Sequence, residues 1–365
     1  MEHGGIKNQG IQMKVLEFIR THENWESILS GSPYNLRIKR DGCYFLLEYN
    51  MYSSDFALDI VQECRGIIFH KDGYCVARPF KKFFNYGEEY AAEIDWNTAY
   101  VTEKIDGSLM KAWYHNGWHL STNGTIDAYK AIVTDKGVSF GDIFERALGY
   151  SFEELCKYLN RDYTYCFELT SPKTTVVIPY DYGVYFLTAF NTKTGEEDRS
   201  KITAPNIKFP AEYSLYSLDD VVKVVSQMSK DHEGIVVADG DGNRIKVKSP
   251  EYLIAAHLNN NGAVTTKRII NYVQNGVIDD FVAYMPRYKS MVDKVFDRVN
   301  EIAVKMQNEW EHLPATENRK DFARLVSKSE YKSFLFQKFD NVELSAIDWL
   351  WNLMPAKLAE LVENI

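Results

Sequence analysis

The hydrophobic pattern changes its period once along the chain, and this change limits the possible folds. Up to about residue 248, short apolar and aromatic runs alternate with polar breaks, as in 43–49 and 182–190, which is typical of β-strands. Beyond Tyr252, apolar residues recur at spacings of three and four, which is typical of packed helices; examples are Val292, Val295, Phe296, Val299 and Ile302. We therefore expect an α+β protein, with an antiparallel-sheet domain over residues 1–255 and an all-helical C-terminal domain over residues 256–365.

Two local patterns refine this expectation. Residues 109–114 and 118–122 are apolar runs on either side of Asn116-Gly117, which predicts a β-hairpin. A helical stretch is expected around residues 143–159.

Composition excludes several classes of protein. No stretch approaches the ~18 consecutive apolar residues of a membrane span, and the start of the chain lacks the apolar core of a signal peptide. Five scattered cysteines form no Cys-x-x-Cys pair, which suits a reducing compartment. The net charge of -9 argues against a protein that coats nucleic acid, because such binding needs clustered Lys and Arg. We expect a cytoplasmic monomer without membrane contact.

The sequence Lys104-Ile105-Asp106-Gly107 offers a candidate nucleophile at the end of an apolar run. An amine attacks phosphorus only when unprotonated, so a lysine with a reference pKa of ~10.4 needs nearby cations, a metal or desolvation. Gly107 would allow a phosphate or a backbone segment to come close. The alternative is a strand lysine before an ordinary Asp-Gly turn, and only companion residues elsewhere decide between the two.

Three further segments supply possible companions. Glu168 is a carboxylate inside an apolar strand, where it faces either a polar ligand or a structural cation. Lys246 and Lys248 alternate with apolar residues, so both point to one face of a strand and favour an anion between them. The run Lys81-Lys82-Phe83-Phe84 interleaves cations with aromatic rings, which suits either nucleotide binding or a solvated strand edge.

Four of these motifs, taken in order, resemble those of the covalent nucleotidyltransferase superfamily of ligases and mRNA capping enzymes. The motifs are Lys104-Ile105-Asp106-Gly107, Phe167-Glu168, Glu233-Gly234 and Lys246-Val247-Lys248. Three more features are similar to the phage-type RNA ligase 1 family, and the resemblance covers roughly residues 45–285. They are Glu63-Cys64-Arg65-Gly66, Lys82-Phe83-Phe84-Asn85 and Tyr252 four residues after Lys248.

The resemblance implies an ATP-dependent RNA ligase that acts in three steps. Lys104 would attack the α-phosphate of ATP to give lysyl-AMP and pyrophosphate, AMP would pass to an RNA 5'-phosphate, and a 3'-hydroxyl would displace it. Arg65 and Lys82 would contact the phosphates, Glu168 the ribose, and Phe84 the adenosine. The other implied nucleotide contacts are Tyr49, Asp106, Gly107, Lys246 and Lys248.

The resemblance also implies a metal and a later step. Glu233 would hold hydrated Mg²⁺, for which Mn²⁺ could substitute, and Asp279 is a second candidate metal contact. Tyr252 would support a later step. The chain has Asn123 where the family usually has a basic residue before Gly124, so one expected phosphate contact is lost.

Three alternative functions stay open. A nick-sealing polynucleotide ligase shares these motifs, and a capping-type guanylyltransferase shares the lysine chemistry but would use GTP and carry a small β-barrel after Lys248. A non-catalytic RNA-binding relative is the third. The expected partners are single-stranded RNA or RNA ends, with the cleaved anticodon loop of tRNA as one candidate in RNA repair, in the host cytoplasm if the chain is phage-encoded.

Overall fold

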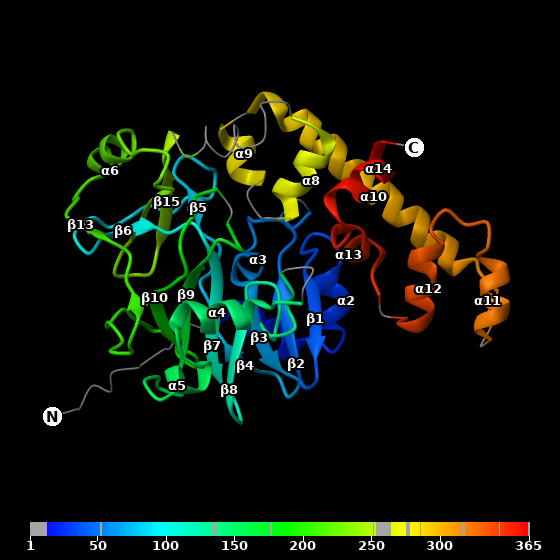
Figure 1. Cartoon of the computed structure of the whole chain (residues 1–365), viewed down its shortest axis with the longest axis horizontal. Coiled ribbons are helices and arrows are strands. Elements are labelled where there is room, and N and C mark those ends of the chain that lie inside the picture. The colour runs from blue at the N-terminus through cyan, green and yellow to red at the C-terminus, as the bar shows by residue number, and fades with distance from the viewer. Residues whose placement is uncertain are drawn as a thin grey trace. The chain divides into compact units, whose positions relative to one another are not determined.

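The computed structural model describes residues 13–363 except 52, 134–136, 176, 251, 253–263, 275–277, 285, 315, 317 and 343. The chain divides into two compact units, Met1–Ala256 and His257–Ile365. Figure 1 shows that strands dominate the first unit and helices the second. The expected fold class, α+β with an antiparallel-sheet part followed by a helical part, is confirmed.

The described part of the first unit contains three sheets. Their strand orders are β1-β2-β3-β4, β11-β10-β9-β7-β8 and β13-β6-β14-β15-β5, and β12 adds to β10 of the second sheet. Most pairings are antiparallel, whereas β12 with β10 and β5 with β15 are parallel. The strands are β1 Arg37–Asp41, β2 Tyr44–Glu48, β3 Arg65–His70, β4 Tyr74–Ala77, β5 Phe84–Asn85, β6 Tyr100–Lys104, β7 Ser108–Tyr114, β8 Trp118–Thr122, β9 Tyr163–Thr170, β10 Gly183–Asn191, β11 Glu197–Asp198, β12 Ile207–Lys208, β13 Glu212–Tyr213, β14 Gly234–Ala238 and β15 Arg244–Lys248.

Helices pack on the sheets of this unit and bury their apolar faces. They are α1 Lys14–Thr21, α2 Trp25–Ser30, α3 Asp59–Glu63, α4 Phe140–Leu148, α5 Phe152–Cys156 and α6 Leu218–Val225. The helices α1 to α3 share a core with the β1 to β4 sheet, α4 and α5 with the β7 to β10 strands, and α6 with β6, β14 and β15. Since the apolar residues of β15 enter the α6 core, its alternate residues Arg244, Lys246 and Lys248 face the other way.

The sequence correctly predicts the β7–β8 hairpin and helical structure after it, but not the division of that structure into two helices. Asn116 and Gly117 form the hairpin turn with positive φ of 55° and 145°. The helical stretch expected around residues 143–159 consists of two helices. The first, α4, ends before Gly149, whose φ of 80° caps it, and the Ser151 side chain begins α5 by accepting from the Glu154 amide.

The second unit consists, in its described part, of helices. They are α8 Thr266–Gln274, α9 Ile278–Tyr284, the 3-10 helix η1 Pro286–Tyr288, α10 Lys289–Glu311, α11 Arg319–Leu325, α12 Lys332–Asp340, α13 Ala346–Trp351 and α14 Pro355–Glu363. The apolar residues that predicted packing on α10 are all buried. Among the residues described, no helix has the length and apolar character needed to cross a membrane.

Candidate functional site

Lys104 shares a buried carboxylate with a second lysine. Its Nζ donates to Glu233 Oε2 at 2.6 Å, and Lys248 Nζ lies 2.7 Å from Glu233 Oε1. The three residues come together because β14 pairs with both β6 and β15, which sets Gly234 opposite Lys104 on one side and Lys248 on the other. The Lys104 side chain is 21% exposed, whereas that of Glu233 is buried. One lysine therefore reaches the surface while its partner carboxylate stays inside.

The two lysines keep the buried Glu233 carboxyl group ionised. Burial opposes ionisation of Glu233, but Lys104 and Lys248 outweigh it and hold the pKa of the carboxyl below its ordinary value. Removing Glu233 would leave two ammonium groups side by side in a half-buried site.

Asp106 and Tyr252 form a buried, hydrogen-bonded pair close to Lys104. The Tyr252 hydroxyl donates to Asp106 Oδ1 at 3.2 Å, and the amides of Val177 and Ile178 donate to Oδ2 at 3.0 and 2.9 Å. Burial, assisted by Glu233, raises the pKa of Asp106. Tyr252 is 2% exposed and lies under Lys248, with Nζ 5.4 Å from its ring centroid. Tyr252 thus links Asp106 to Lys248 in the buried part of the site.

Glu168 borders this group through Gly107. A Cβ on Gly107 would lie 2.5 Å from the Leu169 carbonyl oxygen and 3.0 Å from Glu168 Cγ, so the close approach expected at Gly107 is to the β9 backbone. Burial raises the pKa of Glu168 to about 7, although Lys104 and Arg65 act in the opposite direction. Glu168 is therefore within electrostatic reach of both cations.

Arg65 is turned toward the site by a β-bulge. The β2–β3 register shifts so that Leu47 pairs with Ile67 and Glu48 with Arg65, which leaves Gly66, with φ of 75°, as the extra residue. The Arg65 guanidinium lies 5.1 Å from the Phe83 ring centroid, and its Nη1 is buried without a hydrogen-bond partner. A buried orphan donor of this kind suits an anionic ligand.

Lys82 lies among the rings of Tyr49, Phe56 and Phe84. The sequence singles out Tyr49 and Phe84 through the family resemblance. It misses Phe56, which lies in a short turn-rich segment without strand or helix periodicity. The sequence also gives no role to Phe83, although it lies in the quoted run beside Lys82.

Lys246, Asn123 and Lys111 complete the surroundings. Lys246 is partly buried on β15, opposite Val236. Asn123 Oδ1 is buried without a partner, and the Asn123 carbonyl adjoins Gly66. Lys111, which the sequence analysis passes over, is fully buried and donates to the Gly66 carbonyl. Burial lowers its pKa to about 7.

Of the two residues predicted to contact a metal, only Glu233 lies beside Lys104 in the first unit. Asp279 lies on α9, partly buried in the second unit, and its predicted metal role stays a prediction. Among the described residues, no group of three or more His, Cys, Asp or Glu side chains is arranged to hold a metal ion. Glu233 nevertheless supplies the hard oxygen ligand that Mg²⁺ prefers, and Mg²⁺ commonly binds through one carboxylate together with substrate phosphates and water. The donor set therefore fits a metal that arrives with a nucleotide.

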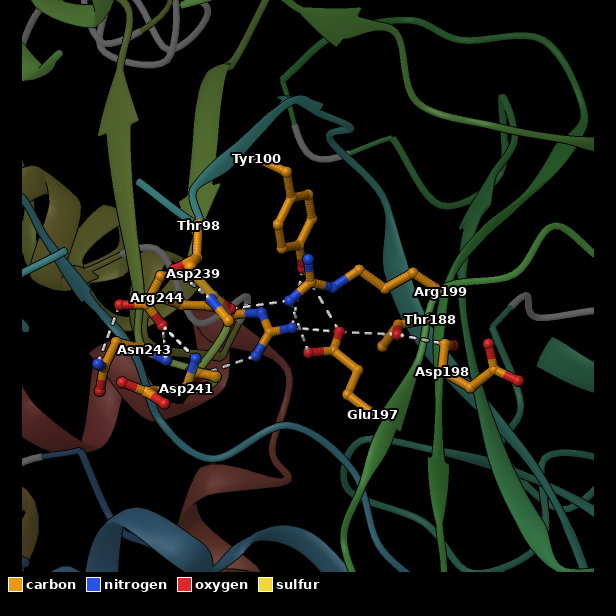
Figure 2. A network of polar contacts seen from close by, with 12 residues as sticks. Thr98, Tyr100, Thr188, Glu197, Asp198, Arg199, Asp239, Asp241, Asn243 and Arg244 are labelled. Carbon is orange, nitrogen blue, oxygen red and sulfur yellow. Dashed lines mark hydrogen bonds and ion pairs between the residues drawn. The ribbon is translucent and has the colours of Figure 1, made fainter. Parts of the chain in front are cut away.

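A polar clamp of Glu197, Arg244, Tyr100 and Arg199 joins the two sheets that carry these residues (Figure 2). Arg244 of β15 forms an ion pair with Glu197 of β11 and donates to the Tyr100 hydroxyl of β6 at 3.0 Å. Arg199 stacks over the Tyr100 ring at 3.4 Å. Arg244 and Glu197 are both about nine-tenths buried, so the clamp fixes β15 against the β10–β11 side.

Comparisons with known proteins give a consistent result. The model of a family described as RNA ligase matches residues 63–252. A putative bifunctional polynucleotide kinase/RNA ligase of Autographa californica nuclear polyhedrosis virus is 30% identical over an alignment of 389 positions, gaps included. The alignment covers all of this chain and 52% of that protein. The RNA ligase of Rhodothermus phage RM378 is 24% identical, over 90% of this chain and 92% of that protein. A solved archaeal ATP-dependent RNA ligase matches with a TM-score of 0.43 and 11% identity, over 87% of this chain and 89% of that one.

Proposed function

Because the chain belongs to the RNA ligase family, whose model covers just over half of it, we propose that it is an ATP-dependent RNA ligase with Lys104 as its nucleophile. The observation that carries this proposal is the pairing of Lys104 with the buried Glu233 beside Lys248. The chain spans about half the length of the baculovirus relative, whose name includes a kinase. The proposal concerns ligation alone.

The first step is nucleotidyl transfer to Lys104. Nζ attacks the α-phosphorus of ATP, an N–P bond forms, and the bond to the bridging oxygen breaks as pyrophosphate leaves with the electron pair. As an ammonium group, Nζ must lose one proton before it attacks and a second as the N–P bond forms. Glu233 Oε2, which already accepts a hydrogen bond from Nζ, is placed to receive one of them, and the departing pyrophosphate takes the other. Lys246 and Lys248 supply positive charge to the α-phosphate.

The remaining residues hold the nucleotide and position the lysines. Arg65 and Lys82 bind the outer phosphates, Glu168 accepts from the ribose, and Tyr49 and Phe84 form part of the same pocket. Asp106, Gly107 and Tyr252 support Lys104 and Lys248 from below. Glu233 would hold Mg²⁺, which neutralises charge on the phosphates when bound.

The substrate class is RNA with a 5'-phosphate and a 3'-hydroxyl. AMP passes from Lys104 to the 5'-phosphate oxygen with cleavage of the N–P bond, and the 3'-hydroxyl then displaces AMP. Because Asn123 stands where the family usually has a basic residue, one expected phosphate contact is missing, and we expect this to lower the efficiency of a later step. A tRNA cleaved in its anticodon loop is the candidate natural substrate.

The decisive experiment is incubation with α-labelled ATP or GTP and Mg²⁺, followed by a denaturing gel. We expect label from ATP on the wild-type chain and none on Lys104→Ala. Lys157→Ala is the matched control, because Lys157 is exposed at the end of α5 and forms an ion pair with the exposed Glu154. Label on Lys104→Ala, or stronger labelling by GTP, would contradict the assignment.

A second arm of the same experiment identifies the nucleic acid. Labelled 5'-phosphorylated single-stranded RNA, a tRNA nicked in its anticodon loop and a nicked DNA duplex are each supplied with ATP. Sealing of the two RNAs supports the proposal. Preferential sealing of the DNA nick would favour the nick-sealing alternative.

A further inference from the structure

Lys82 is surrounded by an aromatic box, which we define as Tyr49, Phe56 and Phe84. The Lys82 Nζ lies 5.4, 5.1 and 5.3 Å from the three ring centroids, respectively. Met51 Sδ closes the arrangement at 3.6 Å from Nζ. The ammonium group is therefore nearly equidistant from three ring faces or edges, within the range of cation–π attraction.

Phe56 is the central member of the box. Its ring packs edge-on against Tyr49 at 5.1 Å and against Phe84 at 5.9 Å. Gln62 connects the Phe56 segment to Lys82. Its side-chain amide donates to the Phe56 carbonyl at 2.7 Å, and its main-chain carbonyl accepts from the Lys82 main-chain amide at 2.7 Å. Phe56 thus contacts both other rings and is linked through Gln62 to the Lys82 backbone.

The chemistry of the box differs from that around Lys104. Glu233 is an anion, and it offsets part of the positive charge of the two lysines it binds. An aromatic ring attracts a cation through its quadrupole and carries no net charge, so the rings of the box do not themselves neutralise the Lys82 ammonium. Arg65, the other cation expected at the outer phosphates, also lies over a ring, that of Phe83.

We propose that Phe56 is a positioning residue that, with Tyr49 and Phe84, aims Lys82 at the β- and γ-phosphates of ATP. This inference rests on the proposed function and deepens it. It also changes the expected role of Phe84, which acts through Lys82 rather than on the adenine. Because the β- and γ-phosphates leave as pyrophosphate, the box acts in the formation of lysyl-AMP and in its reversal by pyrophosphate, and not in sealing.

The test compares Phe56→Leu with Phe56→Tyr, which keeps the ring, in the full chain. The KM for ATP in lysyl-AMP formation should rise about fivefold in Phe56→Leu and stay near the wild-type value in Phe56→Tyr. Discharge of lysyl-AMP by pyrophosphate should weaken to the same extent. Sealing of chemically pre-adenylated RNA, which carries no β- or γ-phosphate, should be unchanged in both variants.

Two results would overturn the inference. One is a wild-type KM for ATP in Phe56→Leu, and the other is an equal loss in sealing of pre-adenylated RNA, which would indicate a merely structural role. Absence of lysyl-AMP from the wild-type chain would overturn the proposed function and this inference together, whereas normal wild-type labelling with an unchanged KM overturns the inference alone.

A double-mutant cycle keeps the test decisive if Phe56→Leu does not fold. Phe84→Leu should raise the KM for ATP in the wild-type background and have almost no effect in Lys82→Met, because the ring acts through that lysine. The ratio of ATP to GTP labelling should stay the same in Phe84→Leu. Additive effects, or a changed nucleotide ratio, would place Phe84 on the base and refute the box.

Discussion

At the scale of single residues, Glu168 shows a conflict between stability and binding. Its carboxyl group is partly buried in β9, and burial raises its pKa from 4.5 to about 7. Since the folded state holds a proton that the unfolded state has already released, stability is lost as pH rises from about 4.5 to about 7, and the loss stays constant above that. The same carboxylate, once ionised, is a strong acceptor for a hydrogen bond from a ribose hydroxyl.

Glu168→Gln should therefore stabilise the chain at pH 8 by about 2 kcal/mol and have little effect at pH 4. Urea unfolding at pH 4, 6 and 8 measures this difference. Glu153→Gln, on the exposed surface of α5, serves as the control and should show no such trend. Lysyl-AMP formation should fall in Glu168→Gln at every pH, and a variant equally stable at pH 4 and pH 8 would refute the burial argument.

At the scale of elements, the polar clamp determines where β15 lies. Glu197→Gln leaves Arg244 buried without its carboxylate, and removal of one member of a buried pair costs about 3 to 5 kcal/mol. We expect a loss of this size in urea unfolding, and a smaller one for Glu197→Gln combined with Arg244→Met. Lys157→Ala, which breaks an exposed pair, should change stability by less than about 1 kcal/mol. Equal losses in the three variants would mean that the clamp is not a buried ion pair in solution.

Elements with a local signal could be predicted from the sequence, and contacts between distant elements could not. The Asn116-Gly117 hairpin and the buried stripe of α10 follow from turn chemistry and periodicity. Glu197 lies on a strand of two residues, and its partner Arg244 is 47 positions away, so no periodic pattern joins them. The burial of Lys111 cannot be predicted for a related reason. A lysine in a strand is normally solvated, and only the fold places this one inside. The motifs around Lys104, Glu233 and Lys248 identify these residues as candidates. The pairing of β14 with β6 and β15 then explains why they lie close together.

At the scale of the whole molecule, the two units suggest a division of labour. Apart from the candidate metal contact Asp279, the first unit contains the described residues proposed for nucleotide transfer, and its sheets each pack on helices within the unit. We hypothesise that the helical unit selects and positions RNA, reading its shape through a few cations such as Lys267 and Arg268.

A chain ending at residue 256 should keep part of its lysyl-AMP formation, while sealing of 5'-phosphate, 3'-hydroxyl RNA falls by about tenfold or shifts to other substrates. Circular dichroism must first show that the fragment is folded. Sealing of the same RNAs at the wild-type rate by a folded fragment would show that the helical unit does not recognise the substrate.

The bulge at Gly66 has a consequence for how this protein can diverge. A Cβ at this position would lie 2.1 Å from the Asn123 carbonyl oxygen and 2.9 Å from Lys111 Nζ, on a backbone with φ of 75°. Gly66 therefore meets the β7–β8 hairpin and the segment that follows it at a point that leaves no room for a methyl group. Residue 66 can change only if the backbone at Asn123 moves as well, so over evolutionary time a substitution at position 66 is expected together with changes in the hairpin, including position 111.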